Sequence, residues 1–204
     1  MTTVMGGFEL VYDPKTKKVS LPEGTDLPDI KLELEQLNTL TSELISNGNE
    51  VPPPPSQESF NKDMSKMIMK MYESGVGSFR KGDYEAAARQ FSLGIEMIVR
   101  RLKFEAFQGT IQELTPFLMS RADAYLKTKE YLKAFNDADL LLNMQINAPD
   151  NFLRRGVSNY FLENYEDARA DYQRGLAFAE NNERLLSELE ICLDKILEEN
   201  GDKI

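Results

Sequence analysis

Residues 154–178, RRGVSNYFLENYEDARADYQRGLAF, decide the fold because their spacing of small and aromatic residues occurs three times in the chain. Here Gly156 precedes Tyr165 by nine residues, and Ala168 and Tyr172 follow Tyr165 by three and seven. A small first residue lets two helices approach closely, and the aromatic fills the space beside that contact. The same offsets join two earlier sets: Ala122, Tyr131, Ala134 and Ala138, and Gly75, Tyr84, Ala87 and Phe91.

The distance between two copies gives the period of the repeat. Tyr131 and Tyr165 are 34 residues apart (165 − 131 = 34), which is the period of a tetratricopeptide repeat, a pair of antiparallel helices. Lys81-Gly82-Asp83 and Glu163-Asn164 supply residues that tolerate the left-handed backbone of the turns between helices. The chain therefore resembles the tetratricopeptide family over roughly residues 61–180.

The first repeat departs from this period. Tyr84 and Tyr131 are 47 residues apart, 13 more than the period (47 − 34 = 13), and the surplus lies around MIVRRLKFEAFQGT. We expect it to lengthen the second helix of repeat one and its loop, with Arg100, Arg101 and Lys103 as a solvated basic island. Met64, Met67, Ile68 and Met71 have helical spacing and favour a core over a Met-rich binding face.

The N-terminal residues predict a separate small unit. Residues 8–12 and 18–21 read as two strands of a hairpin around a turn at residues 13–16, and an amphipathic helix runs from Leu27 to just before Asn47-Gly48. About 50 residues are marginal as an independent fold. We expect residues 1–50 to dock on a partner subunit; folding back onto the repeats is the alternative.

A proline run separates this unit from the repeats. Residues 51–57, VPPPPSQ, force an extended spacer, although a proline-recognition ligand is an alternative. Residues 58–204 then form the repeat domain and end in a capping helix that begins at residues 181–183. The predicted fold is all-α: three tetratricopeptide repeats and a C-terminal capping helix, preceded by a small β-hairpin/helix unit. The apolar stripe of the capping helix is Leu185, Leu186, Leu189, Leu193, Ile196 and Leu197.

Composition excludes several classes of protein. A net charge of −10 and a pI near 4.7 argue against nucleic-acid binding and against a basic membrane-surface helix. No apolar run reaches the ~20 residues of a membrane span, and the first ten residues do not resemble a signal peptide. We therefore expect no direct membrane insertion. Cys192, the single cysteine, lies in an apolar helical pattern and is expected to be a core residue rather than a reactive thiol.

Catalytic groups are scarce. The sequence has no histidine, no cysteine cluster, no glycine-rich phosphate loop and no nucleophile beside a base. We therefore predict that the protein is not an enzyme and that it uses no cofactor or metal. What remains is the groove lined by the first helix of each repeat, which suits an extended peptide or a helix.

One subset of the tetratricopeptide family holds the acidic C-terminal tail of cytosolic heat-shock chaperones in this groove, by a carboxylate clamp. The resemblance places the Lys and Asn of repeat one at Tyr72 and Val76. It places the Asn of repeat two at Ser120, a shorter donor. The Lys of repeat three falls on Asp150, which has the wrong sign, so only Arg154 matches its clamp residue.

A tail would therefore need a variant clamp with Arg154 as its anchor. Ser120 is still a donor, and Tyr72 offers an apolar or stacking contact. Arg80 and Lys127 lie one helical turn further along the groove side. An ordinary ion pair inside its own repeat explains Arg154 equally well.

The whole arrangement resembles a more specific family, with SKMIMKMYESG, LGIEM and RRLKFEAF following the N-terminal unit and proline spacer. These are the tetratricopeptide-repeat cytosolic subunits of the fungal endoplasmic-reticulum post-translational protein-translocation complex. The resemblance implies a membrane-anchored sister subunit, bound through residues 1–50, and docking of DnaK-type or ribosome-associated chaperones. The location implied is the cytosolic face of the endoplasmic reticulum. The alternative is an architectural repeat subunit whose groove another complex member fills.

Overall fold

The computed structural model describes residues 2–5, 8–48, 61–101 and 107–201. These residues form two compact units, an N-terminal unit with the strands and one helix, and a helical unit. The proline spacer at residues 51–57 and Lys103 lie outside the described residues.

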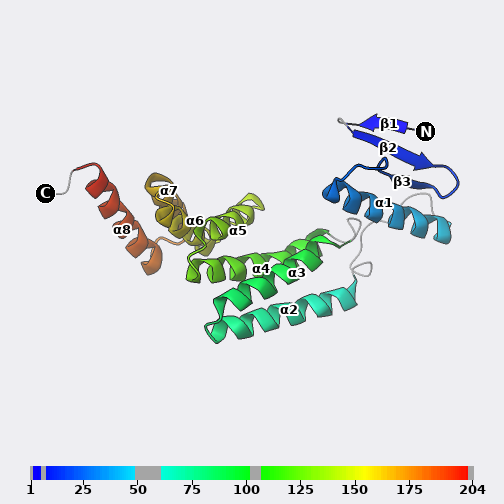
Figure 1. Ribbon diagram of the computed structural model, residues 1–204. Helices are drawn as coiled ribbons and strands as arrows, with labels where there is room; N and C mark the ends of the chain where they lie inside the picture. The colour runs from blue at the N-terminus through cyan, green and yellow to red at the C-terminus, as the bar shows by residue number, and fades with distance from the viewer. Residues whose placement is uncertain (1, 6–7, 49–60, 102–106, 202–204) are drawn as a thin grey trace. The chain divides into compact units, whose positions relative to one another are not determined.

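The N-terminal unit is a three-stranded antiparallel sheet and one helix (Figure 1). The hairpin and the helix were predicted, whereas the outer strand β1 was not. At the hairpin turn, Asp13 accepts hydrogen bonds from the Lys15 N–H and the Thr16 hydroxyl, and Lys17 has a φ of 60°. The elements are β1 (Thr2–Met5), β2 (Phe8–Asp13), β3 (Lys18–Ser20) and α1 (Pro28–Asn47), in the sheet order β1-β2-β3.

The side-chain amide of Asn38 links helix α1 to the sheet by two hydrogen bonds. Asn38 accepts a hydrogen bond from the Val19 N–H and donates one to the Val19 carbonyl, both at 2.8 Å. These are the outward backbone groups of β3, so Asn38 occupies the edge that another strand would need. The helix stops at Gly48, whose φ of 65° is the left-handed conformation of a helix C-cap.

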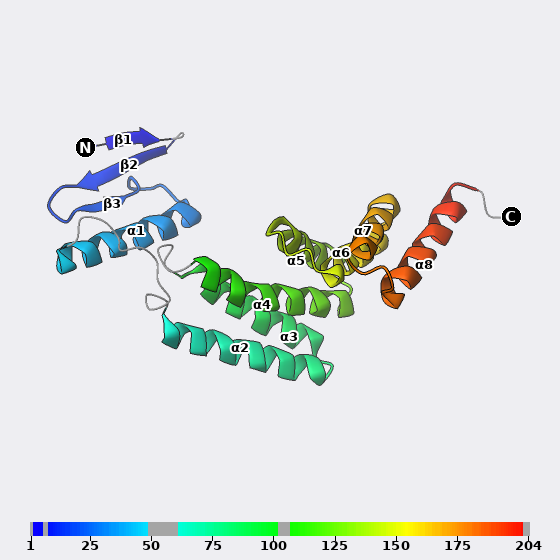
Figure 2. The same ribbon diagram turned by 180° about the vertical axis from the view of Figure 1, so that it is seen from behind.

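The helical unit contains the three predicted repeats and the capping helix (Figures 1 and 2). Each repeat is a pair of helices joined by a short turn. Repeat one is α2 (Lys62–Arg80) and α3 (Tyr84–Val99), repeat two is α4 (Phe107–Lys127) and α5 (Tyr131–Asn143), repeat three is α6 (Pro149–Phe161) and α7 (Tyr165–Phe178), and the cap is α8 (Glu183–Glu199).

The small residues of the repeat lie where helices meet. A Cβ on Gly75 would be 2.5 Å from the Phe91 ring, and a Cβ on Gly156 would be 2.5 Å from the Tyr172 ring. Repeat two has Ala138 where the other repeats have Phe91 or Tyr172. Its Ala122 stands where the other repeats have glycine, and it is fully buried. The spacing of small and aromatic residues is thus a packing requirement between paired helices.

Each turn between the paired helices contains a residue in the left-handed conformation. Gly82 has a φ of 81° and Glu163 a φ of 64°, and both are among the residues predicted for these turns; Asn164 is the N-cap of α7. Lys129 has the same conformation before α5, with a φ of 62°. The turn geometry is therefore set by the packing of the two helices, which outweighs the small cost of a left-handed non-glycine residue.

The surplus of repeat one lies mainly in the following helix. We expected the second helix of repeat one to lengthen, but α3 has 16 residues, against 13 and 14 in α5 and α7. Helix α4 has 21 residues, against 13 in α6. Its first turns add apolar side chains such as Leu114 and Phe117 to the core of repeat one.

The expected basic island is divided between surface and interior. Arg100 is exposed and pairs with Glu96. Arg101 is only 3% exposed and donates to both carboxylate oxygens of Glu113 and to the Ser65 hydroxyl. It also donates to the carbonyl of Asn61 at the start of α2, so Arg101 ties the α3 end to α2 and α4.

Helix α8 caps the repeats by packing about half of its predicted apolar stripe against repeat three. Leu185 and Cys192 are fully buried against repeat three, and the Cys192 thiol donates to the Tyr165 carbonyl at 3.2 Å. Burial, followed by the charge of Glu166, raises the pKa of this thiol, as expected for a core cysteine. Leu186, Leu193 and Leu197, predicted in the same stripe, stay exposed.

Candidate functional site

The groove side of the helical unit holds a cavity of about 390 Å³. The first helices of the three repeats contribute to it, α2 by Phe79, α4 by three residues and α6 by four, and α8 adds one residue. Its lining combines apolar and charged side chains: Phe79, Leu126, Leu153 and Val157, with Asp123, Lys127, Asp150, Arg154 and Arg184.

For Arg154 the sequence left open a clamp residue or an ion pair inside its own repeat. In the structure it forms an ion pair, but with a residue of repeat two. Its Nε and Nη2 donate to the two carboxylate oxygens of Asp123 at 2.7 and 2.8 Å, so the pair is bidentate. Its Nη1 donates to Asn151, which is fully buried and anchored in turn to the Ile146 carbonyl. Three of the five guanidinium N–H groups are used, which leaves two for a ligand.

Two further cations of the cavity have no such partner. Lys127 and Arg184 are exposed, and neither forms an ion pair in the part of the chain that the structure describes. Asp150, at the repeat-three Lys position, also lines the cavity. With Asp123 neutralising Arg154, the remaining charges are two positive and one negative, so the cavity is weakly cationic within an acidic protein.

The structure separates the remaining predicted residues from this cavity. The Tyr72 hydroxyl lies 3.3 Å from the Ser120 hydroxyl, and the Tyr72 ring packs on Phe91 and Phe117. Val76 packs against the same core, and Arg80 is exposed at the end of α2. Tyr72 and Ser120 therefore meet each other, while only Arg154 and Lys127 of the predicted set line the cavity.

Sequence reasoning missed Asp123 and Arg184. Asp123 lies three residues after Ser120 on α4, and a bidentate pair across two helices leaves no signal in either helix alone. Arg184 lies in the first turn of α8, outside the three repeats on which the clamp positions were placed. Treating the capping helix as the first helix of a fourth repeat would have identified Arg184.

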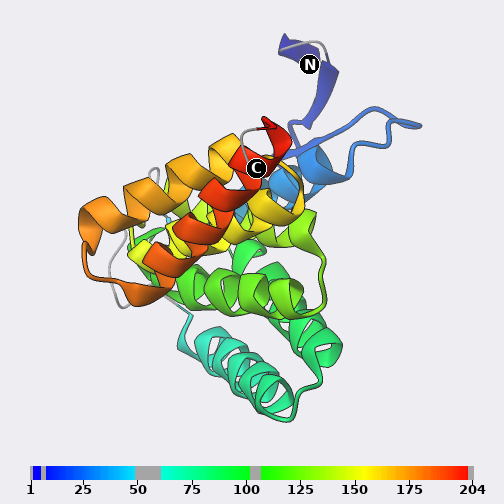
Figure 3. The same cartoon turned by 90° about the vertical axis from the view of Figure 1, so that its left-hand side faces the viewer.

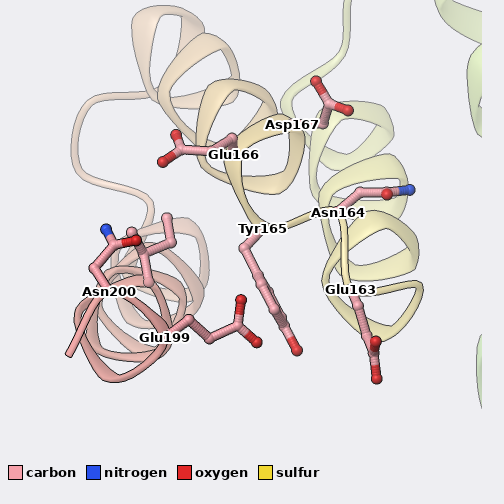
Figure 4. Close-up of a pocket in the computed structure, with 8 residues that line it drawn as sticks. Glu163, Asn164, Tyr165, Glu166, Asp167, Glu199 and Asn200 are labelled. Carbon is pink, nitrogen blue, oxygen red and sulfur yellow. The ribbon is translucent and has the colours of Figure 1, made fainter.

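A second pocket, of about 250 Å³, has the opposite character (Figure 4). It lies between the α6–α7 turn and the end of α8, and Figure 4 shows Tyr165 and Glu199 on facing sides of it. Burial, and next the charge of Glu199, raise the pKa of Tyr165. Four of its eight lining residues are acidic, so it disfavours an anionic ligand: Glu163, Glu166, Asp167 and Glu199.

Within the described residues, no group of His, Cys, Asp or Glu side chains is placed to hold a metal ion. None of the helices in the described ranges combines the length and apolar content that a bilayer span requires.

Comparison with known proteins gives a match over nearly all of this chain. The chain is 32% identical over 196 residues to the translocation protein SEC72 of Saccharomyces cerevisiae, covering 95% of this chain and 98% of that protein. It matches no protein-family model.

Solved structures agree with this match. A chain in the cryo-EM structure of the Sec complex from S. cerevisiae superimposes with a TM-score of 0.74 and 31% identity, covering 94% of this chain and 99% of that one. The first tetratricopeptide domain of Spaghetti (RPAP3), bound to the HSP90 peptide SRMEEVD, has a TM-score of 0.54 and 20% identity over 71% of this chain and 98% of its own. At that identity the likeness establishes the fold alone.

Proposed function

Because the chain belongs to the family of the translocation protein SEC72, we propose that it is a tetratricopeptide subunit of the endoplasmic-reticulum post-translational translocation complex. It acts there as an adaptor on the cytosolic face of the membrane, held peripherally by a membrane-anchored sister subunit. Residues 1–50 form the contact with that subunit. Only Leu34 and Gln36 are buried among the described side chains of this unit, and Leu32, Leu37 and Ile45 of α1 are exposed, which supports docking on a partner.

The ligand of the groove is the acidic C-terminal tail of a cytosolic DnaK-type or ribosome-associated chaperone. The observation that carries this proposal is the cavity in which Lys127, Arg154 and Arg184 meet. A peptide ending in Asp presents two carboxylates, whose lost hydration requires several charge-assisted donors. The two unpaired cations and the two remaining N–H groups of Arg154 supply such donors.

The apolar wall of the cavity suits the rest of such a tail. Phe79, Leu126, Leu153 and Val157 line it beside the cations, and a Val before the terminal Asp would remove apolar surface from water there. The likeness in fold to a domain holding SRMEEVD supports an extended peptide in this groove.

The other predicted clamp residues extend the site along α2 and α4. We assign Tyr72 and Val76 to apolar contact with upstream residues of the tail, and Ser120 to a hydrogen bond, which requires it to exchange its Tyr72 partner. Arg80 is exposed at the end of α2, next along the chain to the cavity residue Phe79, and attracts the acidic residues of the tail.

The test uses the peptide SRMEEVD, labelled with a fluorophore, and the full chain. Anisotropy titration should give saturable binding that weakens about tenfold with Arg154→Ala and several-fold with Lys127→Ala. Arg100→Ala is the matched control, because Arg100 is an exposed arginine of α3 paired with Glu96, outside the cavity. Equal loss with all three variants would mean a non-specific charge effect and would reject the site.

An architectural subunit is the second candidate function. The observation that favours it is the Asp123–Arg154 pair, which already neutralises the anchor of the clamp. In that case another member of the complex fills the groove, and SRMEEVD does not bind the isolated chain. Binding of SRMEEVD that requires Arg154 would exclude this alternative.

A further inference from the structure

Helix α8 carries more apolar surface than repeat three covers. Its buried side packs on α6 and α7, and a second row of leucines lies next to it on the helix surface. This row has spacings of seven and four residues, so its members share one side of the helix. The exposed fractions are 46% for Leu186, 39% for Leu193 and 44% for Leu197.

The repeat frame assigns this exposed row to a definite role. Adding the 34-residue period to a position of α6 gives the equivalent position of α8. The buried side then matches, because Asn151, fully buried on α6, corresponds to the fully buried Leu185. The exposed side corresponds as follows: Phe152 to Leu186, Gly156 to Glu190, and Asn159 to Leu193.

In α6, all three of these positions contact the second helix of the repeat. The Phe152 ring stacks on a phenylalanine of α7 with centroids 5.6 Å apart. Gly156 lies beneath the Tyr172 ring, and Asn159 donates to an α7 aspartate at 3.1 Å. The face of α8 around Leu186, Glu190 and Leu193 is therefore the surface on which the second helix of a fourth repeat would pack, and Leu197 extends this face by one turn.

Within its unit, that surface has no covering helix among the described residues. Figures 1 and 2 show α8 at the end of the series α6, α7, α8, and Figure 3 shows α7 and α8 lying side by side. Terminal repeats of solenoids normally present a polar outer face. Helix α8 differs, because it exposes Leu186, Leu193 and Leu197. An exposed apolar patch of this kind is typical of a surface that binds a partner.

The charge on this surface identifies the kind of helix that fits. Glu190 stands at the centre, at the position of Gly156, and forms no ion pair in the described part of the chain. An aromatic ring such as Tyr172 would meet a carboxylate there, whereas a Lys or Arg would be paired. A second copy of this chain would bring its own Glu190 and seven further acids of residues 180–203, so self-association is disfavoured.

We propose that the outer face of α8, formed by Leu186, Glu190, Leu193 and Leu197, binds an amphipathic helix of another protein. That helix packs as the second helix of a fourth repeat, with apolar residues on the three leucines and a Lys or Arg on Glu190. The surface is separate from the groove cavity, so both sites can be occupied at once.

The probe is a peptide built from α7 itself, residues 164–179, with Asp171→Leu to meet Leu193 and Tyr172→Lys to meet Glu190. A side-chain lactam on its outer face keeps it helical, since a short peptide is marginally helical alone. Circular dichroism confirms helicity before use, so that failure to bind counts against the surface. Binding to the full chain is followed by anisotropy.

We expect saturable binding that Leu193→Ser reduces at least tenfold and Glu190→Lys at least fivefold. A charge-reversed peptide, with Tyr172→Glu, should bind Glu190→Lys better than the unchanged chain. Leu132→Ser is the matched control, because Leu132 is 61% exposed on α5, away from this face, and should leave binding unchanged.

Three results would overturn the proposal. The first is no binding of the helical peptide. The second is equal loss with Leu132→Ser and Leu193→Ser, which would mean non-specific apolar contact. The third is a concentration-dependent dimer in sedimentation that Leu193→Ser abolishes, which would assign the face to a second copy of the chain.

Discussion

Arg154 and Asp123 face each other across α6 and α4 in a bidentate ion pair, with N–O distances of 2.7 and 2.8 Å. The residue that matches a carboxylate clamp therefore already holds a carboxylate of its own chain. A peptide tail bound as we propose would compete with Asp123 for the same guanidinium, and its binding free energy would include the cost of weakening that pair.

The first prediction concerns this competition. Asp123→Asn removes the internal carboxylate and should raise the affinity for SRMEEVD by roughly tenfold, about 1.4 kcal/mol, because Arg154 then presents a full charge to the tail. Asp167→Asn, an exposed carboxylate change at the start of α7, is the control. Weaker binding by Asp123→Asn would mean that Asp123 positions Arg154 for the ligand.

The second prediction concerns the cation from the capping helix. Arg184→Ala should weaken tail binding several-fold, since an exposed charge contributes up to about 1 kcal/mol. Asp150→Lys, which restores the clamp residue of repeat three, should strengthen it by a similar factor. Calorimetric titration measures both. If neither substitution changes the affinity, the tail does not reach the α8 end of the cavity.

The third prediction compares two glycines of repeat helices. Gly156→Ala places a Cβ 2.5 Å from the Tyr172 ring and should cost roughly 1–3 kcal/mol of unfolding free energy. Gly77→Ala, where a Cβ meets nothing within 4 Å, should stabilise by about 0.5–1 kcal/mol through helix propensity. Urea unfolding measures both, and similar effects at the two sites would contradict close helix packing at Gly156.

The fourth prediction separates two neighbouring arginines. Arg101→Ala leaves Glu113 without its bidentate partner in a site where Arg101 is 3% exposed, and should destabilise the chain by about 3 kcal/mol. Arg100→Ala removes an exposed i,i+4 pair and should stay within about 0.5 kcal/mol. Equal melting temperatures for the two variants would refute the buried role of Arg101.

The fifth prediction is a loss of stability in alkali. Burial raises the pKa of the Cys192 thiol and of the Tyr172 hydroxyl, while the unfolded groups titrate near roughly 8.5 and 10. Above these values the folded state binds more protons than the unfolded state, so stability falls as pH rises. The denaturation midpoint should decline from about pH 8.5 upward, and less steeply in Cys192→Ala. An equal slope in that variant would mean that the thiol is not protected.

Much of the fold follows from local sequence because each repeat solves the same packing problem. Gly75 and Gly156 must be small where Phe91 and Tyr172 cross them, and that requirement is visible as spacing. Glu163 was predicted as a turn residue, whereas Lys129, which has the same left-handed backbone, was not, because helix packing imposes that conformation on a residue without a preference for it. Strand β1 was missed because a short edge strand has no periodicity of its own.

The candidate site was harder to predict because its charges act across helices. Arg154 was identified, but its partner Asp123 is 31 residues away, and only the tertiary structure decides that they pair. Arg101 was assigned to a solvated island for the same reason, since its partners Glu113 and Ser65 come from two other helices. Sequence patterns therefore locate the groove. Which of its charged side chains remain available to a ligand depends on the ion pairs that form between helices in the tertiary structure.

The central claim is that the groove reads a C-terminal carboxylate, and one measurement tests it most directly. The full chain is titrated calorimetrically with SRMEEVD as the free acid and, separately, as its C-terminal amide. The account predicts saturable binding of the free acid that weakens at least tenfold with the amide, and a smaller difference between the two in Arg154→Ala. Equal affinity for acid and amide, or no binding of either, would contradict it.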